Sequence, residues 1–198
     1  MEDSLLMCDS TEGDGKAEVV MDYIMSYSLR HAESKYLIEK PTLCRYCRYM
    51  LGKLLEFDID NNMPITSVKV WREWKYIDLC VEVTIGEEQS GEHYAILIEN
   101  KYYGKLRENQ LSDYKKVFDD YYDTKGLPKS QRRYKLVSCF ENEEDIKDIY
   151  GKEIDKVEGF TAIPFYDLIN KDEYWHEKEN AYEETESEIF NEFWLRKW

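Results

Sequence analysis

The stretch YAILIENKYY, residues 94–103, decides how the rest of the sequence is interpreted. Four of its first five residues are apolar, as in a strand that is buried on both faces. The run then continues into Glu99, Asn100 and Lys101. Because side chains alternate along a strand, Glu99 and Lys101 point to one face and Asn100 points to the other. The stretch therefore predicts a core strand that ends with a carboxylate and an ammonium group on the same face.

A second carboxylate lies in the preceding apolar segment, YIDLCVEV at residues 76–83. Alternation puts Asp78 and Glu82 on one face of this strand, where an acid near the core is costly unless it is paired or bound to a metal. If a hairpin brings Asp78 beside Glu99, the two carboxylates repel each other, and Mg²⁺ or Mn²⁺ would relieve that repulsion. Glu82 lies four residues further along, about 13 Å at the rise of a strand, so we interpret it as structural.

Lys101 would complete such a site. An ammonium group beside the metal ligands can orient the attacking water and offset negative charge on a phosphate oxygen. An Asp followed by Glu-x-Lys at the end of a buried strand therefore favours metal-assisted hydrolysis of a phosphodiester bond. The alternative reading is a structural charge cluster at a sheet edge, which would be an awkward choice on such apolar strands.

The succession of periodic segments predicts an α/β fold with a mixed central sheet flanked by helices. We expect helices at 18–36, 43–57, 106–123 and 182–198, and strands at 65–74, 76–85, 94–101, 134–140 and within VEGFTAIPF at 157–165. A flexible N-terminal tail is expected at 1–15. Residues 16–198 are then a single domain, with a core at about 18–140 and a C-terminal extension at 141–198 that ends in an extra helix.

Charge and composition limit the possible partners and the location. The net charge of −15 argues against loose binding to polyanions, but residues 101–135 hold ten Lys or Arg against five Asp or Glu. Residues 171–192 hold nine acids against two lysines, so this acidic part could bind a protein partner or support a homo-oligomer. No apolar run approaches the roughly 20 residues that span a bilayer, and the acidic N-terminus does not resemble a signal peptide. We therefore expect a cytoplasmic protein without a membrane segment.

The five cysteines form an odd set without an export signal, which favours reduced thiols. Cys44 and Cys47 form a CxxC pair, but a zinc site would need a second ligand pair that the sequence does not offer. We interpret them as neighbours one helical turn apart.

Asp78, a hairpin and then Glu99-Asn100-Lys101 resemble the active-site signature of the PD-(D/E)XK nuclease superfamily. The expected order of elements over about 18–140, some 60% of the chain, is similar to the αβββαβ core of its restriction-endonuclease-like fold. Gln110 and Tyr114, in QLSDY, match the Q-x-x-x-Y pattern of its recombination-exonuclease branch, and IENK followed by QL..Y looks like uncharacterised bacterial and phage members. One departure is that Ile77 stands before Asp78 where the signature has proline.

The resemblance implies a Mg²⁺- or Mn²⁺-dependent nuclease that acts on DNA. Asp78 and Glu99 would bind the metal, and Lys101 would position the attacking water or polarise the phosphate. Gln110 and Tyr114 would hold the substrate or support the site. The family also has an acid on its first helix that helps to bind the metal, for which Glu33 is our candidate and Glu18 a weaker one. Glu73, just ahead of Asp78, is a rival candidate for the role of that acid.

Several residues near Lys101 are candidates for contact with nucleic acid. Tyr102 and Tyr103 are the best placed to stack on bases, and Lys105 and Arg107 could contact backbone phosphates. Further basic residues around the site could do the same or could form a solvated face: Lys115, Lys116, Lys129, Arg132 and Arg133.

A second class of function stays open alongside the nuclease. The charge of −15 and the acidic C-terminal part would also suit a non-catalytic protein that binds a basic partner or mimics nucleic acid. A nuclease fold that has lost activity and serves as a binding module lies between the two.

Overall fold

A computed structural model describes residues 4–6, 14–87, 89–140, 142–169 and 183–196. Three helices come first: α1 (Asp14–Arg30), α2 (Tyr36–Glu39) and α3 (Pro41–Leu55). The single helix expected at 18–36 is therefore wrong at its end, because the chain turns after Arg30 and resumes as the short α2. Pro41 begins α3, where its fixed φ and missing N–H cost nothing.

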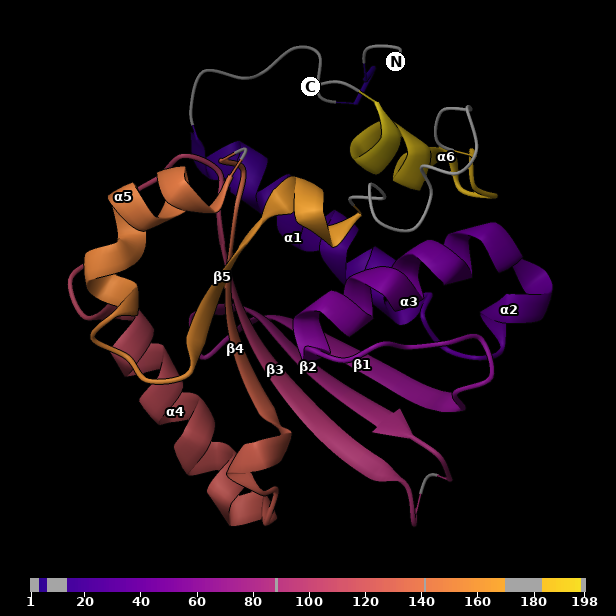
Figure 1. The fold of residues 1–198 in the computed structure, drawn as a ribbon, viewed down its shortest axis with the longest axis horizontal. Helices are drawn as coiled ribbons and strands as arrows, with labels where there is room; N and C mark the ends of the chain where they lie inside the picture. The colour runs from indigo at the N-terminus through magenta and orange to yellow at the C-terminus, as the bar shows by residue number, and fades with distance from the viewer. Residues whose placement is uncertain (1–3, 7–13, 88, 141, 170–182, 197–198) are drawn as a thin grey trace.

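Five strands form one mixed sheet in the order β1-β2-β3-β4-β5 (Figure 1). Their bounds are β1 (Ile65–Trp74), β2 (Ile77–Ile85), β3 (Glu92–Lys101), β4 (Arg132–Ser138) and β5 (Phe160–Pro164). The β1–β2 and β2–β3 pairs are antiparallel, whereas β3–β4 and β4–β5 are parallel. The expected α/β fold with its αβββαβ core and mixed sheet is confirmed, and residues 94–101 of YAILIENKYY lie in the central strand, β3.

Helices cover both faces of this sheet, and each face has its own apolar core. α1 and α3 pack on one face, where they bury Leu79, Ile96 and Ile98 together with the C-terminal aromatic residues. On the other face lies α4 (Gln110–Lys125), which packs over Cys80 and Leu97. α5 (Glu143–Ile154) packs on β5 and over Leu136 of β4 (Figure 1).

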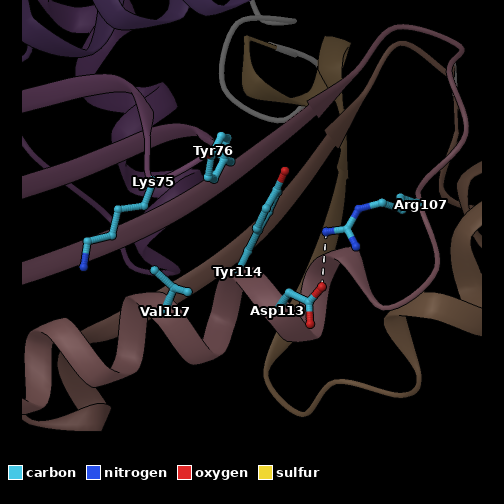
Figure 2. Close-up of a pocket in the computed structure, with 6 residues that line it drawn as sticks. All are labelled: Lys75, Tyr76, Arg107, Asp113, Tyr114 and Val117. Atoms are coloured by element: carbon cyan, nitrogen blue, oxygen red, sulfur yellow. Dashed lines mark ion pairs between the residues drawn. The ribbon is translucent and has the colours of Figure 1, made fainter.

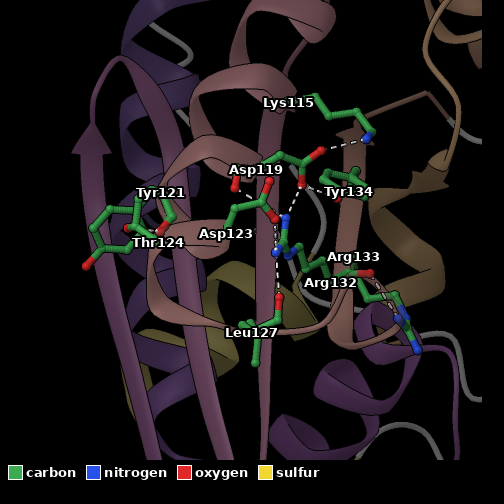
Figure 3. A network of polar contacts seen from close by, with 9 residues as sticks. All are labelled: Lys115, Asp119, Tyr121, Asp123, Thr124, Leu127, Arg132, Arg133 and Tyr134. Carbon is green, nitrogen blue, oxygen red and sulfur yellow. Dashed lines mark hydrogen bonds and ion pairs between the residues drawn. The ribbon is translucent and has the colours of Figure 1, made fainter.

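α4 is held to the sheet by a buried arginine at the start of β4 (Figure 3). Arg132 lies 3.0 Å from Asp119 and 2.6 Å from Asp123, and it donates to the Leu127 carbonyl at 2.5 Å. Tyr134 and Lys115 bind the same Asp119 at 2.5 Å and 2.8 Å. These contacts place the helix, and with it the residues at its N-terminal end, relative to β3.

The C-terminal residues that the structure describes pack on α1 and α3. α6 (Glu188–Phe190) and η3 (Asn191–Leu195) bury Phe190, Phe193 and Trp194, so the expected C-terminal helix is present but shorter than 182–198. The Trp194 indole donates to Ser28 on α1 at 2.9 Å. The Glu186 carboxylate accepts from two backbone N–H groups at the start of α3, at 3.1 Å and 2.9 Å. Much of residues 171–192 lies outside the described residues.

The structure describes only part of the N-terminal tail expected at 1–15. α1 begins at Asp14, inside the range given to the tail, and the Leu5 backbone donates to Glu192 at 2.5 Å. Residues 1–3 and 7–13 lie outside the described part of the chain. None of the described helices is long and apolar enough to cross a membrane.

Candidate active site

Two carboxylates meet across β2 and β3 near the end of the central strand. Leu79 pairs with Ile98 in the antiparallel register, so the next residues, Asp78 and Glu99, stand opposite each other on the face covered by α4. The backbone N–H of Asn100 donates to Asp78 Oδ2 at 2.8 Å, which fixes the shorter carboxylate against the neighbouring strand. Strand alternation thus builds the pair that the sequence predicted.

The two oxygens of Glu99 have different surroundings. Oε1 lies 2.7 Å from Lys101 Nζ and accepts from Gln110 Nε2 at 2.5 Å. Oε2 is buried and has no hydrogen-bond partner. Since a buried carboxylate oxygen is rarely left unsatisfied, Oε2 is an available ligand atom.

Gln110 and Tyr114 reach the site from the first turns of α4. The Gln110 Oε1 atom accepts from the Arg107 backbone N–H at 2.9 Å, so its Nε2 atom points to Glu99. The same Nε2 lies 3.4 Å from the Tyr114 hydroxyl. α4 begins at Gln110 rather than at 106 because Asn109 adopts a left-handed conformation, with φ 59°, directly before it. The structure therefore brings together Asp78, Glu99, Lys101, Gln110 and Tyr114.

Burial controls the charges at this site. Burial and the neighbouring Asp78 raise the pKa of Glu99 well above its usual range, and burial also raises the pKa of Asp78. Burial opposes the charge on Lys101, but Glu99 and Asp78 outweigh that effect and raise its pKa, so Lys101 stays a cation. In the absence of a metal ion, the two carboxylates together retain a proton to a higher pH than ordinary carboxyl groups.

α1 contributes two acids to the site, and only one of them was a candidate from the sequence. Glu18 Oε1 accepts from the Tyr102 backbone N–H at 3.1 Å, and Glu18 Oε2 lies 3.7 Å from Lys101 Nζ. Asp22 is buried and accepts from the Asn100 side chain at 2.6 Å. Burial and the nearby Asp78 raise the pKa of Asp22 to about 7. Asp22 was not a candidate from its sequence pattern, because a single acid in a long helix usually faces solvent.

Glu33 and Glu73 lie elsewhere. Glu33 accepts from the Val68 backbone N–H at 3.0 Å and pairs with Lys35 at 2.5 Å, so it joins the turn after α1 to the middle of β1. Glu73 is exposed on β1. The structure therefore does not place Glu33, our candidate for the first-helix acid, beside Asp78 and Glu99, whereas Glu18 occupies that place.

The candidate contacts for nucleic acid are spread around the site. Tyr102 and Tyr103 pack against each other with ring centres 4.6 Å apart, and Tyr103 is half exposed. Lys105 is exposed, and Arg107 pairs with Asp113 at 3.1 Å. Two of the further basic residues make contacts within the fold. Arg132 pairs with acids of α4, and Arg133 donates to the Leu55 carbonyl at 2.9 Å.

The side chains present fit a small divalent cation with few protein ligands. Among the described residues, no three His, Cys, Asp or Glu side chains gather as a complete ligand set. Mg²⁺, however, typically binds through one or two carboxylates and keeps its other positions for water and substrate phosphate. Asp78 and the unpartnered Oε2 of Glu99 provide such a pair.

The fold and the site together define a restriction-endonuclease-like α/β domain. It has a mixed five-stranded sheet, an acid that faces Glu-x-Lys across two strands, and a Gln on the next helix. A family model described as the PD-(D/E)XK nuclease superfamily matches residues 9–186. The chain belongs to this superfamily. Comparisons with curated proteins and with solved structures gave no match.

Proposed function

We propose that this protein is a nuclease that uses Mg²⁺ or Mn²⁺ to hydrolyse phosphodiester bonds of DNA. One observation supports this most strongly: Asp78 faces Glu99 across the sheet, with one oxygen of Glu99 held by Lys101 and Gln110 and the other without a partner. The described cysteines are all free thiols, which suits a reducing compartment such as the cytoplasm.

Each residue has a distinct role in this proposal. Asp78 and Glu99 would hold the ion, which when bound polarises the phosphate and lowers the pKa of water. Lys101 keeps its positive charge beside Glu99, where it can orient the attacking water and stabilise the charge that develops on the phosphate. Gln110 saturates Glu99 Oε1 and so directs Oε2 toward the ion.

The test is cleavage of labelled single-stranded, double-stranded and branched DNA, and of RNA, with Mg²⁺, with Mn²⁺ and with EDTA. We expect cleavage that requires the ion, and a loss of about 100- to 1000-fold in Lys101→Met, the size of effect seen when one charge-stabilising donor is removed. Lys152→Ala, at an exposed lysine on α5, is the matched control and should cleave like the wild type. If no substrate is cleaved with either ion, the proposal is wrong.

A non-catalytic acidic binding protein would give a different result in the same experiments. It predicts no Mn²⁺ binding at Asp78 and Glu99 and no cleavage. The acids Glu186 and Glu192, in the acidic C-terminal part, make contacts within the chain, with the start of α3 and with residues 4–6. These contacts do not favour a binding role over the nuclease.

A further inference from the structure

A cleft lies beside the active site, between the turn that joins β1 to β2 and the N-terminal half of α4. It has a volume of about 360 Å³ and is lined by Lys75, Tyr76, Arg107, Asp113, Tyr114 and Val117 (Figure 2). Tyr76 and Tyr114 approach it from opposite sides, one from the turn and one from the helix. Two aromatic rings, two cations and an acid make a mixed apolar and polar lining.

Tyr114 connects this cleft to the carboxylates. Its hydroxyl lies 3.4 Å from Gln110 Nε2, and the same nitrogen donates to Glu99 at 2.5 Å. Burial, together with the charges of Glu99 and Asp78, raises the pKa of the Tyr114 hydroxyl. A ligand in the cleft would therefore lie next to the group that we propose to bind the metal.

The turn holds Tyr76 in an unusual way. Lys75 and Tyr76 both have left-handed backbones, with φ of 53° and 71°. Two-residue hairpin turns of this kind favour Asn-Gly, because most side chains are strained in that conformation. Tyr76 is nevertheless 86% exposed, so the apolar core gains little from it. Strained backbone positions cluster at active sites and ligand clamps, and the exposed ring at this one offers a ligand a surface.

We infer that this cleft binds the base of an unpaired DNA nucleotide next to the bond that is cut, with the Tyr76 ring as its stacking surface. The inference rests on the proposed nuclease function and specifies its substrate as single-stranded or frayed DNA. A base inside a duplex is already stacked on its neighbours and cannot offer a face to Tyr76.

The cations of the cleft suit the backbone of such a strand. Arg107 is exposed and its ion pair with Asp113, at 3.1 Å, is exposed as well, so a phosphate can replace the carboxylate at little cost. Lys75 lies over the rings of Trp74 and Tyr121, at 4.9 Å and 5.4 Å from their centres, and extends this surface along the hairpin. Aromatic rings that alternate with cations are the usual surface for single-stranded nucleic acid.

The test is the affinity of the full chain for fluorescein-labelled oligothymidylate and for a blunt hairpin duplex, measured by fluorescence anisotropy in EDTA so that nothing is cleaved. Tyr76→Ala and Tyr76→Asn should bind oligothymidylate roughly 5- to 100-fold more weakly, the range for one lost base–aromatic stack. Tyr76→Phe should bind like the wild type. Asn tolerates a left-handed backbone, so Tyr76→Asn should melt no lower than the wild type, and its loss of binding is then not a loss of folding.

The control and the opposing outcomes separate this inference from the proposed function. Tyr49→Ala, on α3 and on the opposite face of the sheet, should leave both affinities unchanged. The inference is wrong if the wild type does not bind oligothymidylate, if both Tyr76 variants bind it normally, or if they lose duplex binding equally. If Tyr76 proves necessary for binding oligothymidylate but no cleavage occurs with Mg²⁺ or Mn²⁺, the cleft still binds an unpaired base, whereas the proposed nuclease function fails. If cleavage occurs and the Tyr76 variants bind oligothymidylate like the wild type, only the inference fails.

Discussion

Asp22, on the first helix, accepts a hydrogen bond of 2.6 Å from the side chain of Asn100, the residue between Glu99 and Lys101. Asn100 in turn donates its backbone N–H to Asp78. One amide residue thus joins α1 to β2 and β3. Asn100 therefore links the face of β3 that α1 covers to the strand that carries Asp78.

This contact predicts how stability depends on pH. Burial and Asp78 raise the pKa of Asp22 to about 7, helped by Glu18 and opposed by Arg72 and by the hydrogen bond from Asn100. The folded chain therefore holds a proton that the unfolded chain releases near pH 4. The contribution of Asp22 is largest below about pH 4 and is lost as the pH rises to about 7, by up to about 1.4 kcal/mol per pH unit.

Urea unfolding of the wild type and of Asp22→Asn, from about pH 4 to pH 8, checks this. The asparagine keeps an acceptor for Asn100 but cannot titrate, so the stability difference between the two proteins should change with pH. Asp148→Asn, at an exposed acid on α5, should differ from the wild type by a constant amount. A pH-independent difference for Asp22→Asn would contradict the prediction.

Metal binding should strengthen as the pH rises. The raised pKa of Glu99 means that an ion must displace a proton from the Asp78–Glu99 pair. Calorimetry with Mn²⁺ in buffers of different ionisation enthalpy should therefore detect proton release. Glu99→Gln and Asp78→Asn should lose binding. Glu82→Gln, on the same face of β2 but bonded to Tyr122 at 3.0 Å, should bind Mn²⁺ like the wild type.

Gln110 is expected to act on the ion through Glu99. Gln110→Ala removes one of the two donors to Glu99 Oε1, and loss of such a supporting hydrogen bond typically lowers metal affinity or activity by about 10- to 100-fold. High Mn²⁺ should restore the cleavage rate of Gln110→Ala but not that of Lys101→Met. A rate that stays low at saturating Mn²⁺ would instead place Gln110 in direct contact with the substrate.

An ion pair between a buried lysine of β4 and the end of α3 should affect stability. Lys135 on β4 is 1% exposed, and its Nζ lies 2.5 Å from Glu56, at the end of α3, and 2.7 Å from Thr161. Glu56→Ala leaves this ammonium buried with one neutral partner. Since Glu56 itself is about half exposed, we expect a loss of about 1–3 kcal/mol in urea unfolding.

The double variant Glu56→Ala, Lys135→Met tests the reason for that loss. It should recover much of the stability, because no uncompensated charge remains buried. If the double variant is less stable than Glu56→Ala, the cost arises from packing rather than from the unpaired charge.

Local patterns in the sequence were sufficient for most of the sheet and for the proximity of the main site residues. β1 has the expected bounds, and strand alternation with helix periodicity was enough to bring Glu99, Lys101 and Gln110 together. α5 was not predicted, although Asn142 caps it by accepting from Asp145 and acids fill its first turn, which are recognisable start signals.

Contacts between distant segments account for what the sequence did not reveal. Asp22 matters because α1 crosses the end of β3, and Glu33 was a poor candidate because α1 ends before it. The left-handed backbone of Tyr76 follows from the β1–β2 pairing rather than from its residue type, which disfavours that conformation.

The central place of β3 in the sheet also determines which parts of the site can move. Residues 95–98 are paired with β2 on one side and with β4 on the other, so exposing the amides of this segment requires opening two ladders. In hydrogen exchange, these amides should be released only by global unfolding, whereas those of the β1–β2 turn should exchange through local opening. Any closure around a substrate would then come from the turn and from α4, while Glu99 and Lys101 stay fixed as the stationary half of the site.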